Sequence, residues 1–247
     1  MKNISRIFIL AVVFCLLFAG CKKEAGEAYE AGVREIDAGN YYAAIDIFST
    51  VIDDEGESEK AKINALLYTA EANIMLDQND EAIAAYKAAL EYDEKNTKLL
   101  ITLGNVLQKS GKTEDALEFY ERAVSYGDDE ALLYVGAAYI ETECYEEAES
   151  VLLRYAEKDP LDAGTNYYLS KCSYELGNTE AAVIYAENAI QLGDTAYNDM
   201  LLYHLAVLYE DMNQWDKALQ YMGAYVNMYP DDEKARTEYT FISTRVQ

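Results

Sequence analysis

Residues whose types and spacing could do chemistry are scarce in this chain of 247 residues. It holds one histidine, His204, and contains no HxxxH, CxxC or GxSxG motif and no glycine-rich phosphate loop, which are spacings that hold metals, nucleophiles or phosphates. The 45 acidic residues are spread along helical stretches. Close carboxylate pairs arise there by chance, so no pair can be assigned as general acid and base. We therefore expect no catalytic residue, no metal site, no cofactor and no enzyme activity.

The cysteine with a predicted chemical role is Cys21. Two basic residues precede an apolar run of 13 residues, Ile7 to Ala19, which at ~1.5 Å per residue is too short to cross the ~30 Å core of a bilayer. This pattern is typical of a signal peptide over residues 1–20. The segment Leu17-Phe18-Ala19-Gly20-Cys21 resembles a bacterial lipobox. The resemblance implies that Cys21 carries a thioether-linked diacylglycerol and a further acyl chain such as palmitate; the alternative is ordinary cleavage near Ala19, which leaves Cys21 as a free thiol.

A lipid on Cys21 would place the protein at a membrane. Residues 21–24 would form a tether of at most ~14 Å, so the folded part would stand directly over the headgroups. We expect an exported protein that is held at the outer face of a bacterial cytoplasmic membrane, or at the outer membrane if one exists.

The charge of the chain is strongly negative, with 20 Lys and Arg against 45 Asp and Glu and a formal net charge of −25. Such a surface repels phosphate backbones, so nucleic acid is not an expected partner. The excess of acids serves either solubility or a preference for basic partners.

The elements that must position any site are copies of one unit. Six alanines recur at spacings of 38, 34, 32, 34 and 36 residues. They are Ala44, Ala82, Ala116, Ala148, Ala182 and Ala218. A small residue precedes each by twelve places and a mostly bulky one follows by four, as in Gly104 and Tyr120, so small and large side chains can interlock. Proline occurs only at positions 160 and 230 and no strand-like alternation is present, so we predict an all-α fold.

This set of small, aromatic and turn positions, at a period near 34 residues, resembles the tetratricopeptide repeat over residues 25–232. The resemblance implies an α-solenoid, a right-handed superhelix of about six helix–turn–helix repeats. They are expected at 25–58, 63–96, 97–128, 129–162, 163–196 and 199–232. An amphipathic stretch over 233–247 predicts a C-terminal capping helix. The four extra residues between the first two repeats are assigned to a longer loop in the acidic run Asp53–Glu57.

The two remaining cysteines of the mature chain, Cys144 and Cys172, lie in different repeats. Cys172 falls where other repeats carry Ala, Val or Leu, which indicates a small core residue. We expect both thiols to be free or buried, because nothing in their spacing favours a disulfide.

The resemblance further implies a concave groove lined by the first helix of each repeat, in which a protein or peptide partner binds. The groove positions that we select as a partner-binding site are Tyr29, Ile101, Asn105, Tyr167, Lys171, Tyr174 and Tyr203. Only Asn105 and Lys171 resemble the residues of a carboxylate clamp, so such a clamp is not expected. Tyrosine suits binding, because it buries a large area at low entropic cost and keeps a hydroxyl for orientation.

Together these features predict a non-enzymatic, membrane-anchored scaffold or adaptor that binds protein at the cell envelope, with a role in the assembly of an envelope, secretion or pilus complex. A glycan or cell-wall binding module on the cell surface is the alternative, since stacked tyrosines and acidic acceptors also suit sugars.

Overall fold

The computed structural model describes residues 26–160, 162–193 and 196–246, and within these ranges it contains thirteen helices and no strand. The helices are α2 (Glu27–Asp37), α3 (Tyr41–Asp53), α4 (Glu59–Met75), α5 (Asn79–Tyr92), α6 (Thr97–Lys109), α7 (Thr113–Ser125), α8 (Ala131–Glu141), α9 (Tyr145–Ala156), α10 (Ala163–Glu175), α11 (Thr179–Leu192), α12 (Asn198–Asp211), α13 (Trp215–Met228) and α14 (Glu233–Ser243). The prediction of an all-α fold is confirmed. The predicted signal peptide and Cys21 lie outside the described residues.

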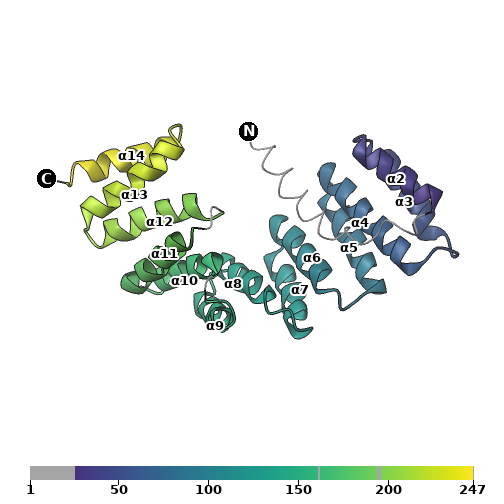
Figure 1. Ribbon diagram of the computed structural model, residues 1–247, viewed down its shortest axis with the longest axis horizontal. Helices are drawn as coiled ribbons and strands as arrows, with labels where there is room; N and C mark the ends of the chain where they lie inside the picture. Colours follow the sequence, from purple (N-terminus) through teal and green to yellow (C-terminus); the bar gives the residue numbers. More distant parts are fainter. Residues whose placement is uncertain (1–25, 161, 194–195, 247) are drawn as a thin grey trace. The chain divides into compact units, whose positions relative to one another are not determined.

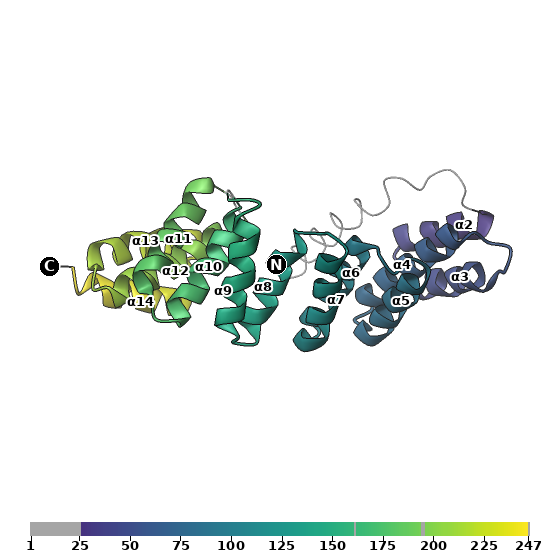
Figure 2. The same cartoon turned by 90° about the horizontal axis from the view of Figure 1, so that it is seen from below.

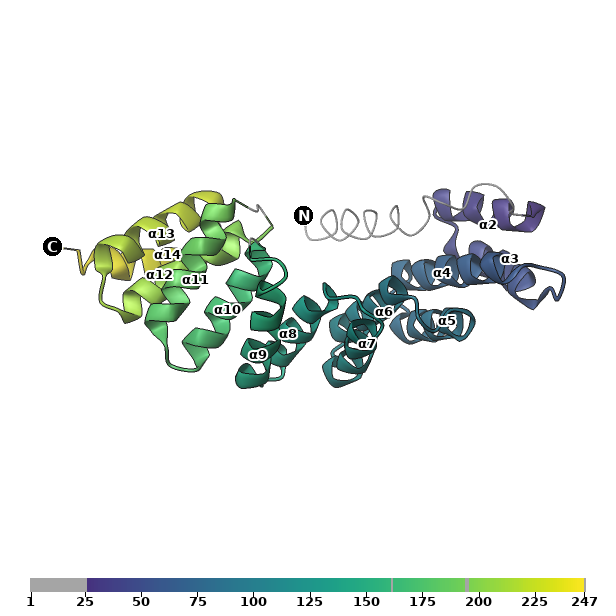
Figure 3. The same cartoon turned by 60° about the horizontal axis from the view of Figure 1, so that its bottom comes forward.

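The chain divides into two compact units, which we call unit 1 (up to Tyr126) and unit 2 (from Gly127). In unit 1, α2 pairs with α3, α4 with α5 and α6 with α7, and the pairs stack through α3 on α4 and α5 on α6 (Figures 1 and 2). In unit 2, α8 pairs with α9, α10 with α11 and α12 with α13, and α14 packs on α13 (Figure 3).

The repeating alanines form the framework of each helix pair. All six are completely buried. The close approach predicted between small and bulky positions is also present: a Cβ added to Gly104 would lie 2.4 Å from the ring of Tyr120, and one added to Gly136 would lie 2.5 Å from Leu152. No larger side chain fits between these helices without moving them, because interiors are already close-packed.

The turn inside every helix pair uses a left-handed residue. Positive φ angles occur at Gly39, Asp77, Gly111, Glu143, Gly177 and Asn213, which are spaced like the alanines. Three of the six turns thus place a residue with a Cβ in a conformation that glycine adopts most readily.

One expectation about the loops is wrong. The loop over 54–58 is no longer than that over 126–130, and the extra residues instead lengthen α4 to 17 residues. Ser58 accepts a hydrogen bond from the backbone N–H of Ala61 at 3.2 Å and so caps the earlier start of this helix. The acidic run is therefore an ordinary connection between repeats.

Within the described ranges, no helix combines the length and the apolar character needed to cross a membrane. Cys144 and Cys172 are not joined by a disulfide. Cys172 is buried beside Ile140 and Leu169, which confirms the prediction of a core residue, and burial raises the pKa of its thiol to about 12.

Candidate functional site

The predicted site residues of unit 1 are partly used for packing. Tyr29 is only 8% exposed, and its ring packs edge-on against Phe48 and Tyr68 at centroid distances of 5.9 and 5.8 Å. Ile101 and Asn105 are half-buried on α6. The hydroxyl of Tyr120 donates to Oδ1 of Asn105 at 2.8 Å. Unit 1 therefore does not present these three side chains as one open surface.

A buried carboxyl also lies in unit 1. Glu71, which lies on α4, has an oxygen, Oε2, without a hydrogen-bond partner among the described residues. Burial and then the charge of Asp37 raise the pKa of Glu71 to about 7. This carboxyl is consequently near half-protonation at neutral pH.

The predicted site residues of unit 2 meet in one hollow of about 500 Å³, which we call the tyrosine pocket. Tyr167, Lys171 and Tyr174 come from α10 and Tyr203 comes from α12, so two successive repeats build it. The other lining residues are Glu175, Asp199, Met200, His204, Val207, Tyr225, Asp232 and Lys234. The four residues selected in this part of the sequence thus share a single site.

Aromatic contacts shape the walls of the tyrosine pocket. The rings of Tyr203 and Tyr225 meet edge-on at 5.2 Å, and those of Tyr174 and His204 at 5.9 Å. Nζ of Lys171 lies 5.9 Å from the ring centroid of Tyr167. Edge-on aromatic pairs hold one another in place, so the walls are largely preformed.

Phenol hydroxyls tie the rims of the tyrosine pocket to carboxylates. Tyr174 donates to Asp211 at 2.5 Å and Tyr225 donates to Asp232 at 3.2 Å. The bond to Asp211, together with burial, raises the pKa of Tyr174 to about 12. Both phenols therefore stay protonated at physiological pH.

His204 is a packing residue that also lines the tyrosine pocket. Its Nε2 lies 3.0 Å from Oγ of Ser170, whose own proton is donated to the carbonyl of Ala182 at 2.7 Å. Nε2 must then be the donor. Burial and then the charge of Lys171 lower the pKa of His204 to about 4, so the ring is neutral at pH 7.

Three family models of the tetratricopeptide repeat match residues 73–134, 138–199 and 201–232, which together make up more than half of the chain. The chain belongs to the tetratricopeptide repeat family. The helix pairs within the matched residues are therefore tetratricopeptide repeats, as the resemblance predicted.

One curated relative of this tetratricopeptide protein is similar over only a small part of its own length. It is 29% identical over 175 residues to the human protein O-mannosyl-transferase TMTC3, which covers 68% of this chain but 19% of that protein. The chain thus spans about a fifth of that relative.

Solved structures share the fold at low sequence identity. A tetratricopeptide repeat protein from Parabacteroides merdae is similar with a TM-score of 0.67 and 18% identity, over 90% of this chain and 94% of that one. PilW, described as a widely conserved type IV pilus biogenesis factor, is similar with a TM-score of 0.65 and 16% identity. The match covers 85% of this chain and 96% of the PilW chain. These likenesses support an all-α tetratricopeptide solenoid.

Several residues of the tyrosine pocket were not selected from the sequence. Asp199 and Met200 precede Tyr203 by four and three places on α12. Helical spacing alone puts them on the face of Tyr203, so this signal was present. Lys234 and Asp232 come from α14 and its N-cap, which the sequence indicated only as a cap.

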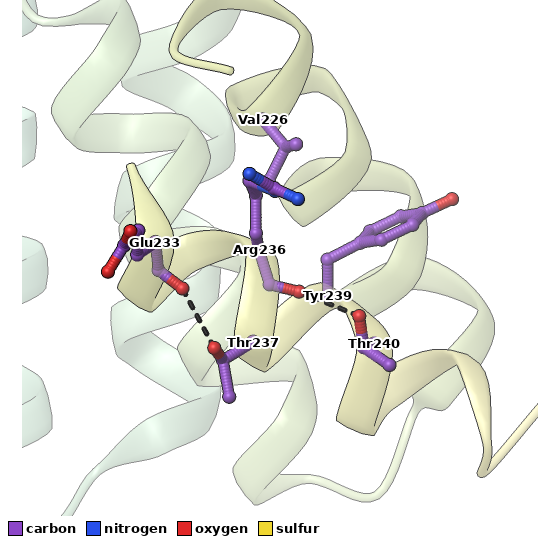
Figure 4. Close-up of a pocket in the computed structure, with 6 residues that line it drawn as sticks. All are labelled: Val226, Glu233, Arg236, Thr237, Tyr239 and Thr240. Carbon is purple, nitrogen blue, oxygen red and sulfur yellow. Dashed lines mark hydrogen bonds between the residues drawn. The ribbon is translucent and has the colours of Figure 1, made fainter. Parts of the chain in front are cut away.

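A second hollow of unit 2, of about 430 Å³, lies along α14 (Figure 4). Arg236 extends there toward Val226 of α13, while Tyr239 points away from it. The hydroxyls of Thr237 and Thr240 donate to carbonyls of α14 itself at 2.8 Å. Its threonine hydroxyls are therefore already used as donors within α14, and the hollow is less suited to a ligand than the tyrosine pocket.

The described residues hold no group of three or more His, Cys, Asp or Glu side chains that could bind a metal ion. In the tyrosine pocket, a neutral imidazole and protonated phenols surround carboxylates without an adjacent nucleophile. The arrangement provides aromatic faces, donors and acceptors for binding a partner.

Proposed function

We propose that this tetratricopeptide protein is a non-enzymatic scaffold that binds a protein partner through the tyrosine pocket. The observation that supports it most is the convergence of Tyr167, Lys171, Tyr174 and Tyr203 from two repeats into one hollow. Tetratricopeptide arrays offer large preformed surfaces for such contacts. Tyr167 is only 9% exposed and packs in the core of unit 2, whereas Tyr203 is 37% exposed. The exposed ring of Tyr203 adds apolar area that needs little ordering on binding.

The proposal includes a lipid anchor at Cys21, supported by the lipobox-like segment Leu17–Cys21. Anchoring would confine the scaffold to a membrane surface and raise the effective concentration of whatever it holds. Assembly of an envelope, secretion or pilus complex is the role we propose. The structural likeness to the pilus biogenesis factor PilW supports this role through shared fold alone.

The binding role can be tested without disturbing the core. Tyr203 and Met200 line the tyrosine pocket and are 37% and 41% exposed, so Tyr203→Ala with Met200→Ala should leave the protein folded. The full chain is used to capture proteins from solubilised cell envelope. We expect the double variant to lose the partner that the unchanged chain retains.

The matched control changes two exposed apolar residues of unit 2 outside the tyrosine pocket, Ile184→Ala with Met228→Ala. This control should capture the partner normally. Equal capture by both double variants would remove the tyrosine pocket from the proposal.

The anchor has its own test. Cys21→Ser should move the protein from the membrane fraction to the soluble fraction, and mass spectrometry should find diacylglycerol on the unchanged chain. An unmodified Cys21 in membrane-bound protein would contradict the anchor.

A glycan or cell-wall ligand is the second candidate, favoured by tyrosine rings beside the carboxylates of Asp199 and Asp232. Binding to purified cell-wall material, lost in the Tyr203→Ala and Met200→Ala double variant, would support this candidate over a protein partner.

A further inference from the structure

Two carboxylates of the tyrosine pocket form no ion pair within the described residues, although the charge of Lys234 contributes to lowering the pKa of Asp232. Asp199 lies in the first turn of α12, and Asp232 is the N-cap of α14. Asp199 accepts a hydrogen bond from the hydroxyl of Tyr229 at 2.9 Å, and Asp232 accepts one from Tyr225 at 3.2 Å. Within the described part of the chain, no Lys or Arg nitrogen lies within 4.0 Å of either carboxylate. Each carboxylate also accepts a backbone N–H, Asp199 from Met200 at 2.9 Å and Asp232 from Ala235 at 3.0 Å. Neutral donors therefore hold both carboxylates in place, and both remain negatively charged.

Both carboxylates influence the pKa of the same side chain, Tyr225. Burial, the hydrogen bond to Asp232 and the charges of Asp232 and Asp199 together raise the pKa of Tyr225. The ring of Tyr225 contacts those of Tyr203 and Tyr229 at 5.2 and 5.1 Å. Two negative charges thus lie at the hydroxyl ends of Tyr225 and Tyr229, and the faces of such rings also attract cations.

The lysines of the tyrosine pocket oppose a cationic ligand but do not outweigh the acids. Lys171 is placed over the ring of Tyr167 on α10, and Lys234 follows Asp232 by two places. Glu175 is a third acid in the lining, so three carboxylates face two ammonium groups around a neutral His204. Unit 2 as a whole holds 7 Lys and Arg against 23 Asp and Glu, a formal net charge of −16. Both the charges that line the tyrosine pocket and the negative net charge of unit 2 therefore favour the binding of a cation.

We propose that the tyrosine pocket takes a lysine or arginine side chain from a basic segment of the partner. Its apolar stem lies on the rings of Tyr203 and Tyr225, and its charged head meets Asp199 and Asp232. The inference rests on the proposed binding function and names the chemistry of the partner. It also gives α14 a role beyond capping, because the N-cap residue of this helix completes the site.

The test uses the full chain and three synthetic peptides of equal length, built from repeated Gly-Ser-Arg, Gly-Ser-Gln or Gly-Ser-Glu. Binding is measured by calorimetry at low and at physiological salt. The Arg peptide should bind, and the Gln and Glu peptides should not. The Oδ1 atom of Asn still accepts the backbone N–H, and its amide N–H can donate to the phenol oxygen in the reverse direction. Asp199→Asn with Asp232→Asn should therefore keep the fold and weaken Arg-peptide binding about tenfold or more.

The control variant carries the same change in charge at two other helix starts of unit 2, Glu180→Gln with Asp216→Asn. Both residues are exposed in the first turn of their helices and lie outside the tyrosine pocket. Binding in this control should stay within about twofold of the unchanged chain, because distant surface charges are screened.

Two results would overturn the inference. One is an equal loss of Arg-peptide binding in both double variants, which would mean general attraction to an acidic surface. The other is tighter binding of the Glu peptide, abolished by Lys171→Met, which would make the tyrosine pocket an anion site. If envelope capture still depends on Tyr203 in either case, the scaffold function stands and only the basic partner is refuted.

Discussion

Tyr29 and Tyr203 occupy the same place in the first and last repeats, fifteen residues before the framework alanines Ala44 and Ala218. Yet Tyr29 is 8% exposed and Tyr203 is 37% exposed. Phe48 and Tyr68 cover the ring of Tyr29, whereas Tyr203 meets Tyr225 on one side and borders a hollow. Position in the repeat decides which way a side chain points, and its neighbours decide whether it remains available to a partner.

The largest expected effect tests this contrast through stability. Tyr29→Ala removes a buried ring and two aromatic contacts, so it should lower the free energy of unfolding by about 3 kcal/mol. Tyr203→Ala removes a ring that is already partly in water and should cost less than about 1 kcal/mol. Urea unfolding followed by circular dichroism measures both. Similar costs for the two variants would remove the distinction between packing and binding tyrosines.

A second difference is the buried carboxyl of Glu71 in unit 1. The folded-state pKa, about 7, lies above the ordinary value of 4.5, so stability should be greatest below pH 4.5 and fall as the pH rises toward 7. Glu71→Gln should remove this dependence and stabilise the protein by about 2 kcal/mol at pH 8. Denaturant midpoints across pH 4–8 measure it. The exposed control Glu91→Gln should keep the slope, and an unchanged slope in Glu71→Gln would contradict the assignment.

Adjacent repeats of unit 2 differ in their turns. Glu143 and Gly177 are equivalent and both have positive φ, at 61° and 81°. Glu143→Gly should therefore stabilise the protein by about 1 kcal/mol, and Gly177→Ala should destabilise it by a similar amount. Thermal unfolding of the two variants shows whether each melting temperature rises or falls relative to the unchanged chain. A loss of stability in Glu143→Gly would mean that its side chain contributes contacts that outweigh the backbone strain.

The smallest expected difference is between Asn105 and Lys171, which also share one place in the repeat. Asn105→Ala removes one acceptor for the hydroxyl of Tyr120, but Oε1 of Gln108 lies 3.0 Å from the same hydroxyl and can accept its proton instead, so the loss of stability should be about 0.5–1 kcal/mol. Lys171→Ala should change stability by less than about 0.5 kcal/mol, because it forms no ion pair within the described residues. Chemical denaturation under identical conditions compares them, and a larger loss for Lys171→Ala would contradict its assignment to a binding surface.

The fold could be predicted because its determinants are local. The alanine spacing and the match of Gly104 with Tyr120 lie within one helix pair, where chain geometry leaves little choice. The place of the extra residues in α4 could not be predicted from the period, which is the same whether an insertion lengthens a loop or a helix. The N-cap at Ser58 fixes where α4 begins and so places the extra residues in this helix.

The candidate site could be predicted in part. Tyr167, Lys171, Tyr174 and Tyr203 follow from helical register, and Asp199 could have been added on the same ground. Asp232 and Lys234 could not, because their place depends on how α14 packs against α13. The burial of Tyr29 likewise depends on Tyr68 in the next repeat, which no spacing within one repeat reveals.

The most direct test of the central claim compares Tyr203→Ala with Ile101→Ala, two full-length variants changed at the same place of different repeats. The amount of envelope partner captured by each folded variant is measured against the unchanged chain. We predict that Tyr203→Ala loses most of the captured partner and that Ile101→Ala retains it. Full capture by Tyr203→Ala together with loss in Ile101→Ala would contradict the assignment of binding to the tyrosine pocket.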